Sequence, residues 1–583
     1  MAAMAMAVAV VSSGPRSLLL AAASQTLPGV AIRPSRMVVA AAAAAAIEIR
    51  NLSVVTQGIT SFSSSRRRGQ QQQATILLPR RLSSISRRHA QVEKKDSVSG
   101  PSIIDAAVHE EILGSSNNNN NAGPISVTPE SEEISWVPVL PHVLTAAMAN
   151  FMFGYHIGVM NGPLESIARE LKFEGDTIMQ GFVVSIFIVG AFIGSISGGV
   201  LADKVGRRRT FQIDAIPLIL GAALSASAQS VEMMVLGRFM VGIGIGVNTS
   251  LVPLYISEVA PTAYRGALGS FCQIGTCIGL ISALVIGIPA ETDPHWWRTM
   301  FWLATIPGVA LMAGMQVAAE SPRWLGKIGR WDDAETTIEK LWGKAQVDVA
   351  MKELRSVSGS QGVDDEVSWS EILSKPYFKV AATGSALFAL QQFAGINGVL
   401  YFSSITFRDA GITNGMAASA AVGVANLTGA LVALSLMDNQ GRRKLLMGSY
   451  TGMALSMGVL VLALEMPGDQ QLAHLLAVGG TLFYVFTFAL GAGPATALII
   501  PELCTTRLRA KTMAVSLCTH WVCNFGVGLL FLQLVQQFGL PAVYTSFGVV
   551  SLLSVAFAYS FIIETKGRSL EEIQMLLNPE MLK

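Results

Sequence analysis

Twelve apolar runs, each about long enough to cross a lipid bilayer, follow one another between residues 137 and 562. A segment in lipid must satisfy its own backbone hydrogen bonds, so runs of this length form helices. Only 14% of the residues are charged, whereas soluble domains carry about 25%. The sequence therefore predicts an all-α membrane protein with twelve transmembrane helices, near residues 137–159, 179–201, 211–229, 234–257, 266–289, 299–319, 378–406, 414–436, 444–465, 474–499, 510–534 and 541–562.

The twelve runs form two groups of six that share an internal repeat. Three charged motifs recur in the same order, with the second copy 235, 244 and 244 residues after the first: Asp203–Arg208 and Asp438–Arg443, Glu258–Arg265 and Glu502–Arg509, Glu320–Arg323 and Glu564–Arg568. Parallel repeats of this kind build transporters with a site between two bundles. We expect six-helix bundles at 136–319 and 378–563, a helical loop on the inner face at 320–377, and a tail at 564–583.

The N-terminal segment differs in composition from the rest of the chain. Residues 1–90 hold eleven arginines and one acid, Glu48, with frequent serine and alanine. This composition is typical of an organellar transit peptide, and the serine and alanine content favours a plastid. A disordered cytosolic tail with a basic patch is the alternative. Residues 91–135 are acidic overall and include five consecutive asparagines, which predicts a disordered linker.

The loops after even-numbered runs are more basic than those on the other face. Without the long loop they carry thirteen lysines and arginines, against four on the opposite face. The positive-inside rule places both termini on the cytosol-like side of the membrane. With a plastid transit peptide, that side is the stroma.

Three carboxamides lie in the seventh apolar run: Gln391, Gln392 and Asn397, with Gly395 among them. Each would leave donors and acceptors unpaired if it faced lipid. Glycine allows a helix to loosen at that depth. Because a carboxamide both donates and accepts, the cluster suits a neutral, polyhydroxylated ligand. Hydrogen bonding between neighbouring helices is the alternative interpretation.

Residues 136–577 resemble the sugar-porter branch of the major facilitator superfamily. The matching motifs are Asp203–Arg208, Gly237–Phe239, Glu258–Arg265, Glu320–Leu325, Gln391–Asn397, Asp438–Arg443, Pro501–Glu502 and Glu564–Arg568. The resemblance implies a transmembrane hexose transporter that works by alternating access. With the N-terminal extension, the chain is most similar to the plastidic glucose translocators of plants, which implies D-glucose as substrate and the plastid inner envelope as location.

The resemblance also implies a sugar site. Its residues would be Gln273, Gln391, Gln392, Asn397, Asn426, Trp521 and Asn524. Their amides can surround a pyranose, and Trp521 or Phe402 can cover an apolar sugar face. Two positions depart from the family. Ala497 stands where many members have tryptophan, and His520 where many have a small polar residue, so the sugar preference stays open.

The first span departs from the pattern of proton-driven members. They carry an aspartate after Gly-Tyr, whereas this chain has His156 after Gly154 and Tyr155. The family pairs that position with an arginine, here Arg238, and a nearby cation disfavours a charged histidine. We therefore expect facilitated diffusion, with proton symport as the alternative. A packing hydrogen bond is the other role considered for His156.

The repeated charged motifs are interpreted as a gate. Ion pairs among them are expected to join the two bundles on the inner face while the site opens outward, and to break when it opens inward. The residues are Asp203, Arg207, Glu258, Arg265, Glu320, Arg323, Asp438, Arg442, Glu502 and Arg509. Ordering of the loops is the alternative role.

Other classes of protein find little support. The sequence has neither a phosphate-binding glycine loop nor a cluster of metal ligands or nucleophiles, so an ATP-driven pump or an enzyme is not expected. The five cysteines lack a CxxC spacing and are expected to be packing residues. A carrier of another sugar and a non-transporting sugar sensor remain alternatives, although a tail of about twenty residues is short for a sensor. The expected partners are a small sugar and the lipid bilayer, with no cofactor and no nucleic acid.

Overall fold

A computed structural model describes residues 135–290, 293, 295–360, 375–409, 411–412, 415–466, 470–504, 509–566 and 572–573. These residues belong to one compact unit, Ser131–Lys583. The predicted transit peptide, almost all of the predicted linker and most of the tail lie outside the described residues, as does the side chain of Asp438. Within the described ranges the chain is helical and contains no strand.

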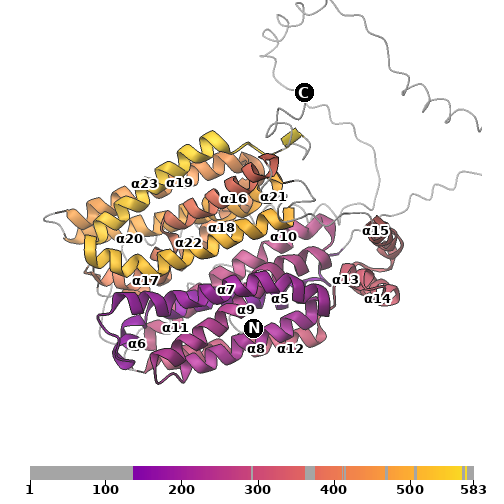
Figure 1. The fold of residues 1–583 in the computed structure, drawn as a ribbon, viewed down its shortest axis with the longest axis horizontal. Coiled ribbons are helices and arrows are strands. Elements are labelled where there is room, and N and C mark those ends of the chain that lie inside the picture. Colours follow the sequence, from indigo (N-terminus) through magenta and orange to yellow (C-terminus); the bar gives the residue numbers. More distant parts are fainter. Residues whose placement is uncertain are drawn as a thin grey trace, which may run out of the picture. The chain divides into compact units, whose positions relative to one another are not determined.

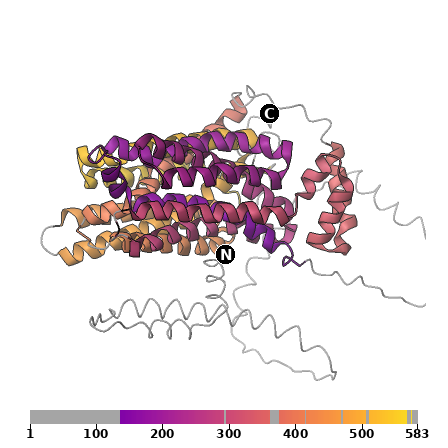
Figure 2. The same ribbon diagram turned by 90° about the horizontal axis from the view of Figure 1, so that it is seen from below.

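The N-terminal half forms one group of helices (Figure 1). They are α5 (Leu140–Asn161), the short α6 (Leu164–Glu170), α7 (Thr177–Val205), α8 (Arg207–Ala226), α9 (Val231–Val259), the short α10 (Arg265–Gly269), α11 (Phe271–Ala290) and α12 (Trp296–Val317). Three further helices, α13 (Pro322–Lys327), α14 (Trp331–Trp342) and α15 (Val347–Ser360), form a separate group at one end (Figures 1 and 2).

The C-terminal half forms the second group. It contains α16 (Lys375–Phe393), α17 (Ile396–Asp409), α18 (Gly415–Gln440), α19 (Arg442–Glu465), α20 (Gln470–Thr487), a π-helical turn (Phe488–Ala492), α21 (Gly493–Leu503), α22 (Arg509–Phe538) and α23 (Leu540–Phe561). Across the seam between the groups, α7 packs on α22, α11 on α18 and α5 on α17.

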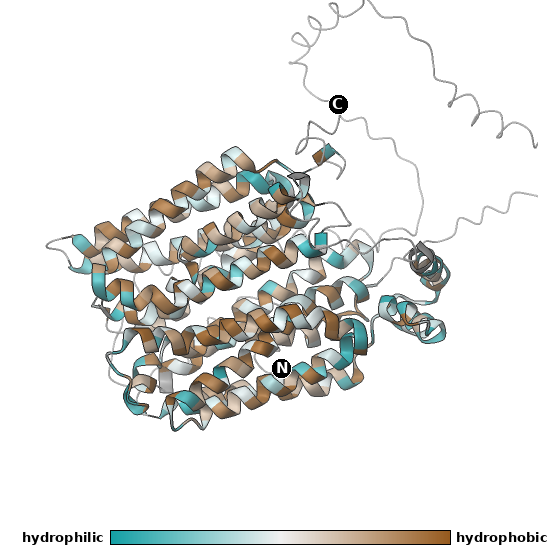
Figure 3. Cartoon of the chain, in the orientation of Figure 1, coloured by the Kyte–Doolittle hydropathy of each residue, from teal (hydrophilic) through white to brown (hydrophobic). Residues whose placement is uncertain are grey.

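The predicted membrane fold is confirmed. Ten segments of the described chain are long and apolar enough to cross a bilayer by length and composition. Two more complete the predicted twelve: α8, which begins with three arginines and contains Asp214, and the broken pair α16–α17. Hydrophobic residues cover the long helices, whereas hydrophilic ones gather at helix ends and on α14 and α15 (Figure 3). Exposed apolar side chains such as Ile196 and Leu553 suit contact with lipid.

The internal repeat is visible in how the charged motifs fold. Gly206 and Gly441, at φ +93° and +86°, begin α8 and α19 in a backbone conformation that favours glycine. The carboxylate of Glu320 accepts the Arg207 backbone N–H at 2.9 Å, and Glu564 accepts that of Arg442, also at 2.9 Å. A carboxylate stabilises a helix N-terminus because the first N–H groups have no partner within the helix. The two halves therefore use the same motif for the same structural task.

Candidate functional site

The seventh span breaks between α16 and α17, at Ala394 and Gly395. Gly395 has φ +98°, and a Cβ atom there would lie 2.1 Å from the ring of Phe547. Only glycine fits both the conformation and the space. The break frees the carbonyl of Ala394, which accepts the Tyr484 hydroxyl at 2.7 Å. This geometry places the end of α16 and the first turn of α17, with their carboxamides, at one point.

The structure brings the three predicted carboxamides of this span together. Asn397 donates to Gln392 Oε1, and Gln392 Nε2 donates to Gln391 Oε1 at 3.2 Å. Gln391 Nε2 in turn donates to the carbonyl of Ala492, in the π-helical turn, at 2.7 Å. All three amides are buried. Since an amide oxygen has two lone pairs, each glutamine oxygen keeps one for a further donor.

Helix α22 adds aromatic and polar side chains beside this cluster. His520 Nδ1 lies 3.0 Å from Gln392 Nε2. Trp521 is 3% exposed, and its indole N–H has no partner among the described residues. Asn524 Oδ1 accepts the Tyr401 hydroxyl at 3.2 Å. A buried indole usually donates to something, so the free N–H of Trp521 is a candidate donor to a ligand.

The structure does not bring every predicted sugar residue to the cluster. Gln273 is exposed on α11, where its amide lies 3.6 Å from Cys277 Sγ. Asn426 is buried in α18. Neither side chain hydrogen-bonds to the cluster within the described residues. Phe402 stacks on Phe531 with ring centroids 5.2 Å apart and is fully buried, which makes it a core residue here. Its place against a sugar, like those of Gln273 and Asn426, stays a prediction.

Arg238 and His156 lie together in the core of the N-terminal bundle, both at 0% exposure. Arg238 donates to the backbone carbonyls of His156 at 3.2 Å and Val184 at 3.1 Å, and its guanidinium lies 4.6 Å from the Phe187 ring centre. No carboxylate pairs with Arg238 in the described part of the chain. Both ring nitrogens of His156 lack a described partner, so no packing hydrogen bond of its ring is found there.

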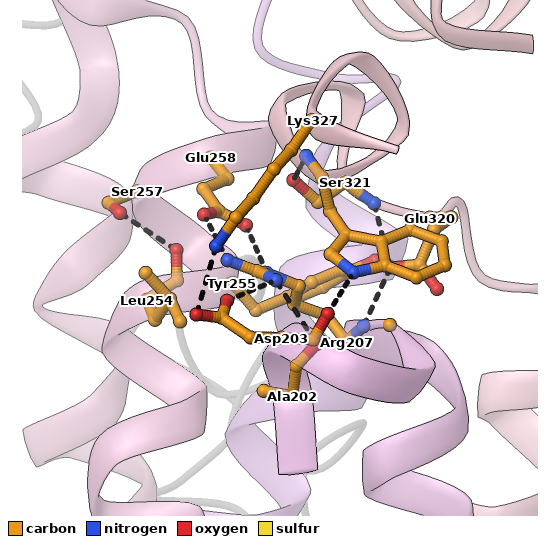
Figure 4. Close-up of polar contacts among 12 residues, drawn as sticks. Ala202, Asp203, Arg207, Leu254, Tyr255, Ser257, Glu258, Glu320, Ser321 and Lys327 are labelled. Carbon is orange, nitrogen blue, oxygen red and sulfur yellow. Dashed lines mark hydrogen bonds and ion pairs between the residues drawn. The ribbon is translucent and has the colours of Figure 1, made fainter. Parts of the chain in front are cut away.

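The repeated motifs lie at the end of the helices that carries α13–α15, here called the motif face (Figure 1), and Figure 4 shows the contacts of the N-terminal copy. Arg207 binds Glu258 through Nε and Nη2, at 2.8 and 2.9 Å, and Asp203 at 3.1 Å. Lys327 of α13 also reaches Asp203, at 3.0 Å. Burial raises the pKa of Glu320. The backbone N–H groups that donate hydrogen bonds to its carboxylate lower the pKa by less, so the net shift is upward.

The C-terminal half repeats these contacts more loosely. Arg442 Nε lies 3.3 Å from Glu502 Oε1, and the Thr565 hydroxyl donates to the same carboxylate at 2.5 Å. Arg265 and Arg323 instead line a cavity of about 790 Å³ between the N-terminal bundle and α13–α15. Arg509, at the start of α22, is partly buried. Among the described residues, no ion pair on the motif face joins the two bundles, so the expected cross-bundle pairs are not present in this conformation.

The opposite end of the helices, here called the far face, is where the bundles are joined. Asn161, the last residue of α5, donates to the carbonyl of Leu400 at 2.8 Å and to the Ser403 hydroxyl at 2.7 Å, and accepts the Ser404 backbone N–H at 2.9 Å. Ser419 of α18 bonds both serine hydroxyls, at 2.8 and 2.9 Å.

Two further contacts cross the seam at this end. Arg408 pairs with Glu165 at 3.0 Å, and Thr177 donates to Gln536 at 3.0 Å. The sequence analysis did not predict these contacts across the seam at the far face. In the sequence they are indicated only by polar residues at the ends of the first and seventh apolar runs.

A separate polar cluster ties the N-terminal bundle together at the far face. Glu170 accepts from Trp297 at 2.7 Å and from Arg298 at 2.7 Å, with His295 at 3.2 Å. Burial acts to raise the pKa of Glu170, but the hydrogen bonds from Arg298, Trp297 and His295 lower it further, so the net shift is downward.

Residues 142–577 match the family model described as "Sugar (and other) transporter". The chain belongs to the sugar transporter family. This sugar transporter is 56% identical over 499 residues to "Probable plastidic glucose transporter 1" of Arabidopsis thaliana, covering 86% of this chain and 93% of that protein. It is 49% identical over 447 residues to "Plastidic glucose transporter 4" of the same plant, covering 77% and 82%.

Its fold also matches a solved transporter structure. The xylose transporter XylE from E. coli, in an inward open conformation, superposes with a TM-score of 0.64 at 27% identity, over 74% of this chain and 98% of XylE. These comparisons confirm the predicted family, and the relatives are sugar transporters, not enzymes.

For a sugar transporter, the arrangement of contacts describes a conformation. The bundles are joined over the far face, while each charged motif at the motif face pairs within its own half. The carboxamide cluster lies on the C-terminal side of the seam, between these two ends.

Proposed function

We propose that this sugar transporter carries hexose, chiefly D-glucose, across a plastid membrane by alternating access. The observation that carries the proposal is the buried group of three carboxamides at the break between α16 and α17, beside the unpartnered indole N–H of Trp521. A sugar hydroxyl is both donor and acceptor, and amides match it in both roles. The relatives named as plastidic glucose transporters support glucose over other hexoses.

The described conformation is proposed to be the inward-open one. In the cycle, sugar bound at the amides would be enclosed as the bundles rock, the Asn161 contacts to α17 would break, and the motif face would close. Arg265, Arg323 and Arg509 are then free to pair with acids of the opposite bundle. Their role in that closed motif face is supported by their position and by the absence of ion pairs between the bundles on the motif face among the described residues.

Transport is proposed to be facilitated diffusion. A proton-coupled carrier needs a titrating group whose charge follows the conformation. Arg238 donates to backbone carbonyls and not to an acid among the described residues. The nearby guanidinium disfavours a second positive charge on the His156 ring. Net sugar transport would therefore be driven only by the sugar concentration gradient across the membrane.

Uptake into proteoliposomes tests the function directly. The purified full-length protein should take up labelled glucose saturably, and an imposed pH gradient should not change the extent of uptake. Uphill accumulation that collapses with the gradient would establish symport instead. Absence of glucose flux, with other hexoses tested beside it, would refute the proposal.

The inner envelope, with both termini in the stroma, is the proposed location. It rests on the basic loops after even-numbered spans and on the basic N-terminal segment. A fluorescent fusion of residues 1–135 should enter plastids, and a C-terminal tag should resist protease added to intact organelles. A fusion retained in the cytosol would contradict the transit-peptide prediction.

A further inference from the structure

His520 occupies a defined position next to the carboxamide cluster. Its ring lies edge-on to Phe388 of α16, with centroids 5.0 Å apart, and edge-on to its neighbour Trp521 at 4.9 Å. One ring nitrogen, Nδ1, lies 3.0 Å from Gln392 Nε2. The imidazole thus packs as an aromatic group and also makes one polar contact.

The direction of this hydrogen bond follows from the chemistry of the two groups. An amide nitrogen only donates, so Nδ1 of His520 must accept, and the neutral ring carries its proton on Nε2. The Gln392 amide has two hydrogens. One points to Gln391 Oε1 and the other to His520 Nδ1. Gln392 Oε1 in turn accepts from Asn397.

The count of donors and acceptors then decides what Gln392 can offer to a ligand. Both of its hydrogens are used within the protein, and one lone pair on its oxygen remains. Without His520 the amide would keep one free hydrogen and could also turn over, since a carboxamide is nearly symmetric in shape. His520 therefore fixes both the orientation of Gln392 and the kind of bond it can make.

We infer that His520 is a specificity-determining positioning residue, which holds Gln392 as a pure hydrogen-bond acceptor so that the sugar hydroxyl bound there must donate its hydrogen. The inference rests on the proposed hexose transport and deepens it. His520 acts through Gln392, so its removal should change which sugars bind more than how fast the bundles cycle.

Two other roles for His520 predict different results. A residue that only fills the space between Phe388 and Trp521 should be replaced best by leucine, which is apolar. A residue that contacts the sugar through Nε2 should be replaced best by glutamine, whose amide reaches about as far as Nε2. A residue that holds Gln392 through Nδ1 should be replaced best by asparagine, whose side-chain oxygen can take the place of Nδ1.

The experiment compares full-length wild type with H520N, H520Q and H520L in proteoliposomes. For each, KM and kcat for glucose are measured, with inhibition constants for the singly deoxygenated and singly fluorinated glucoses. H474N serves as the matched control, because His474 lies near the start of α20, beside Gly411, and makes no hydrogen bond to the cluster among the described residues. It should behave as wild type.

We expect H520N to keep KM within about threefold, and H520Q and H520L to raise it about tenfold with kcat nearly unchanged, as for the loss of one buried hydrogen bond. One ring position of glucose should carry the hydroxyl that donates to Gln392. Replacing that hydroxyl by fluorine or by hydrogen should weaken binding to wild type and to H520N by the same factor, because neither group can donate a hydrogen bond. In H520L the fluoro sugar should improve relative to the deoxy sugar, since the freed amide hydrogen can point at fluorine.

A ranking with leucine best assigns His520 to packing and overturns the inference, and a ranking with glutamine best assigns it to direct contact and overturns it as well. These outcomes leave hexose transport intact. Absence of saturable hexose uptake by the wild-type protein overturns the proposed function and the inference with it. Monodisperse size-exclusion profiles identify the variants that fold, and the ranking is read from H520N against whichever of H520Q and H520L folds.

Discussion

Asn161 at the far face offers a direct test of how the bundles are held. Its side chain makes three hydrogen bonds across the seam, to Leu400, Ser403 and Ser404. Asn161→Ala removes all three. A hydrogen bond between membrane helices is worth about 0.6 kcal/mol on average, and one in a protein interior about 1 kcal/mol. The described conformation, proposed to be inward-open, should therefore lose about 2 to 3 kcal/mol relative to the outward-open state, or about 30- to 150-fold in the equilibrium.

Distances across the far face report this shift. Spin labels would be placed at Glu174 and Gln470, which are exposed on the N- and C-terminal halves, after replacement of the five native cysteines. Without sugar, wild type should show one short distance between the labels. Asn161→Ala should gain a second, longer population. The remaining pair of Glu165 with Arg408 keeps the opening incomplete.

The matched control removes another buried asparagine without touching the seam. Asn248 lies on α9 inside the N-terminal bundle, 1% exposed. Asn248→Ala should leave the distance distribution unchanged. If Asn161→Ala gives the same distribution as this control, the far-face bonds do not hold the inward-open state and the reasoning fails.

Four further substitutions test other parts of the molecule. Gln392→Ala and Asn397→Ala should each lower kcat/KM for glucose at least about 100-fold while the protein still elutes as a folded species; unchanged uptake would remove them from the site. Arg442→Ala should slow cycling about tenfold, the effect of ~1.4 kcal/mol, with sugar affinity from equilibrium binding unchanged, and altered affinity alone would contradict a gate role. Glu170→Gln should destabilise the protein by about 1 kcal/mol at pH 7, because the partly exposed carboxylate is held by Arg298. Since the folded-state pKa of Glu170 is lowered, this stabilisation exists above the ordinary value near 4.5 and should decrease as pH falls below it; a difference in thermal unfolding that does not shrink between pH 5 and pH 3 would count against it.

The fold could be predicted because its signals are local in the sequence. The lengths of the apolar runs predict the spans, and the spacing of Asp203–Arg208 and Asp438–Arg443, which contain Gly206 and Gly441, predicts the repeat. Gly395 among carboxamides predicted a loosened helix, and a positive φ is found there. Each of these depends on which residues lie near one another along the chain.

The conformation could not be predicted in the same way. Motif residues such as Glu258 and Glu502 can pair within a bundle or across the seam, and both arrangements satisfy the same sequence. The free energies of these two conformations differ by about the contribution of a few hydrogen bonds. The pattern of residue types along the chain does not indicate so small a difference. The hydrogen bond between His520 and Gln392 could not be predicted either, because it depends on the rotamers of two side chains that are 128 residues apart in the sequence.

A buried acid was also missed. Asp214 lies in α8 at 2% exposure, and neither carboxylate oxygen makes a hydrogen bond of ordinary geometry among the described residues, although Asn248 of α9 lies beside it. The sequence does show Asp214 as a single acid within the third apolar run, a pattern that predicts a buried carboxyl group. Helix α8 packs closely on α9 inside one bundle, so we expect the surroundings of Asp214 to stay the same when the bundles rock, which fits a structural role.

The carbonyl cage around Arg238 has a consequence for metabolism. With the facilitated diffusion proposed above, each turnover would be as easily reversed as completed. Net movement then depends on which compartment consumes the sugar faster, for instance by phosphorylating it. Enzymes on the two sides of the membrane would set the direction of flow, and the same molecule would serve as importer or exporter as their rates change.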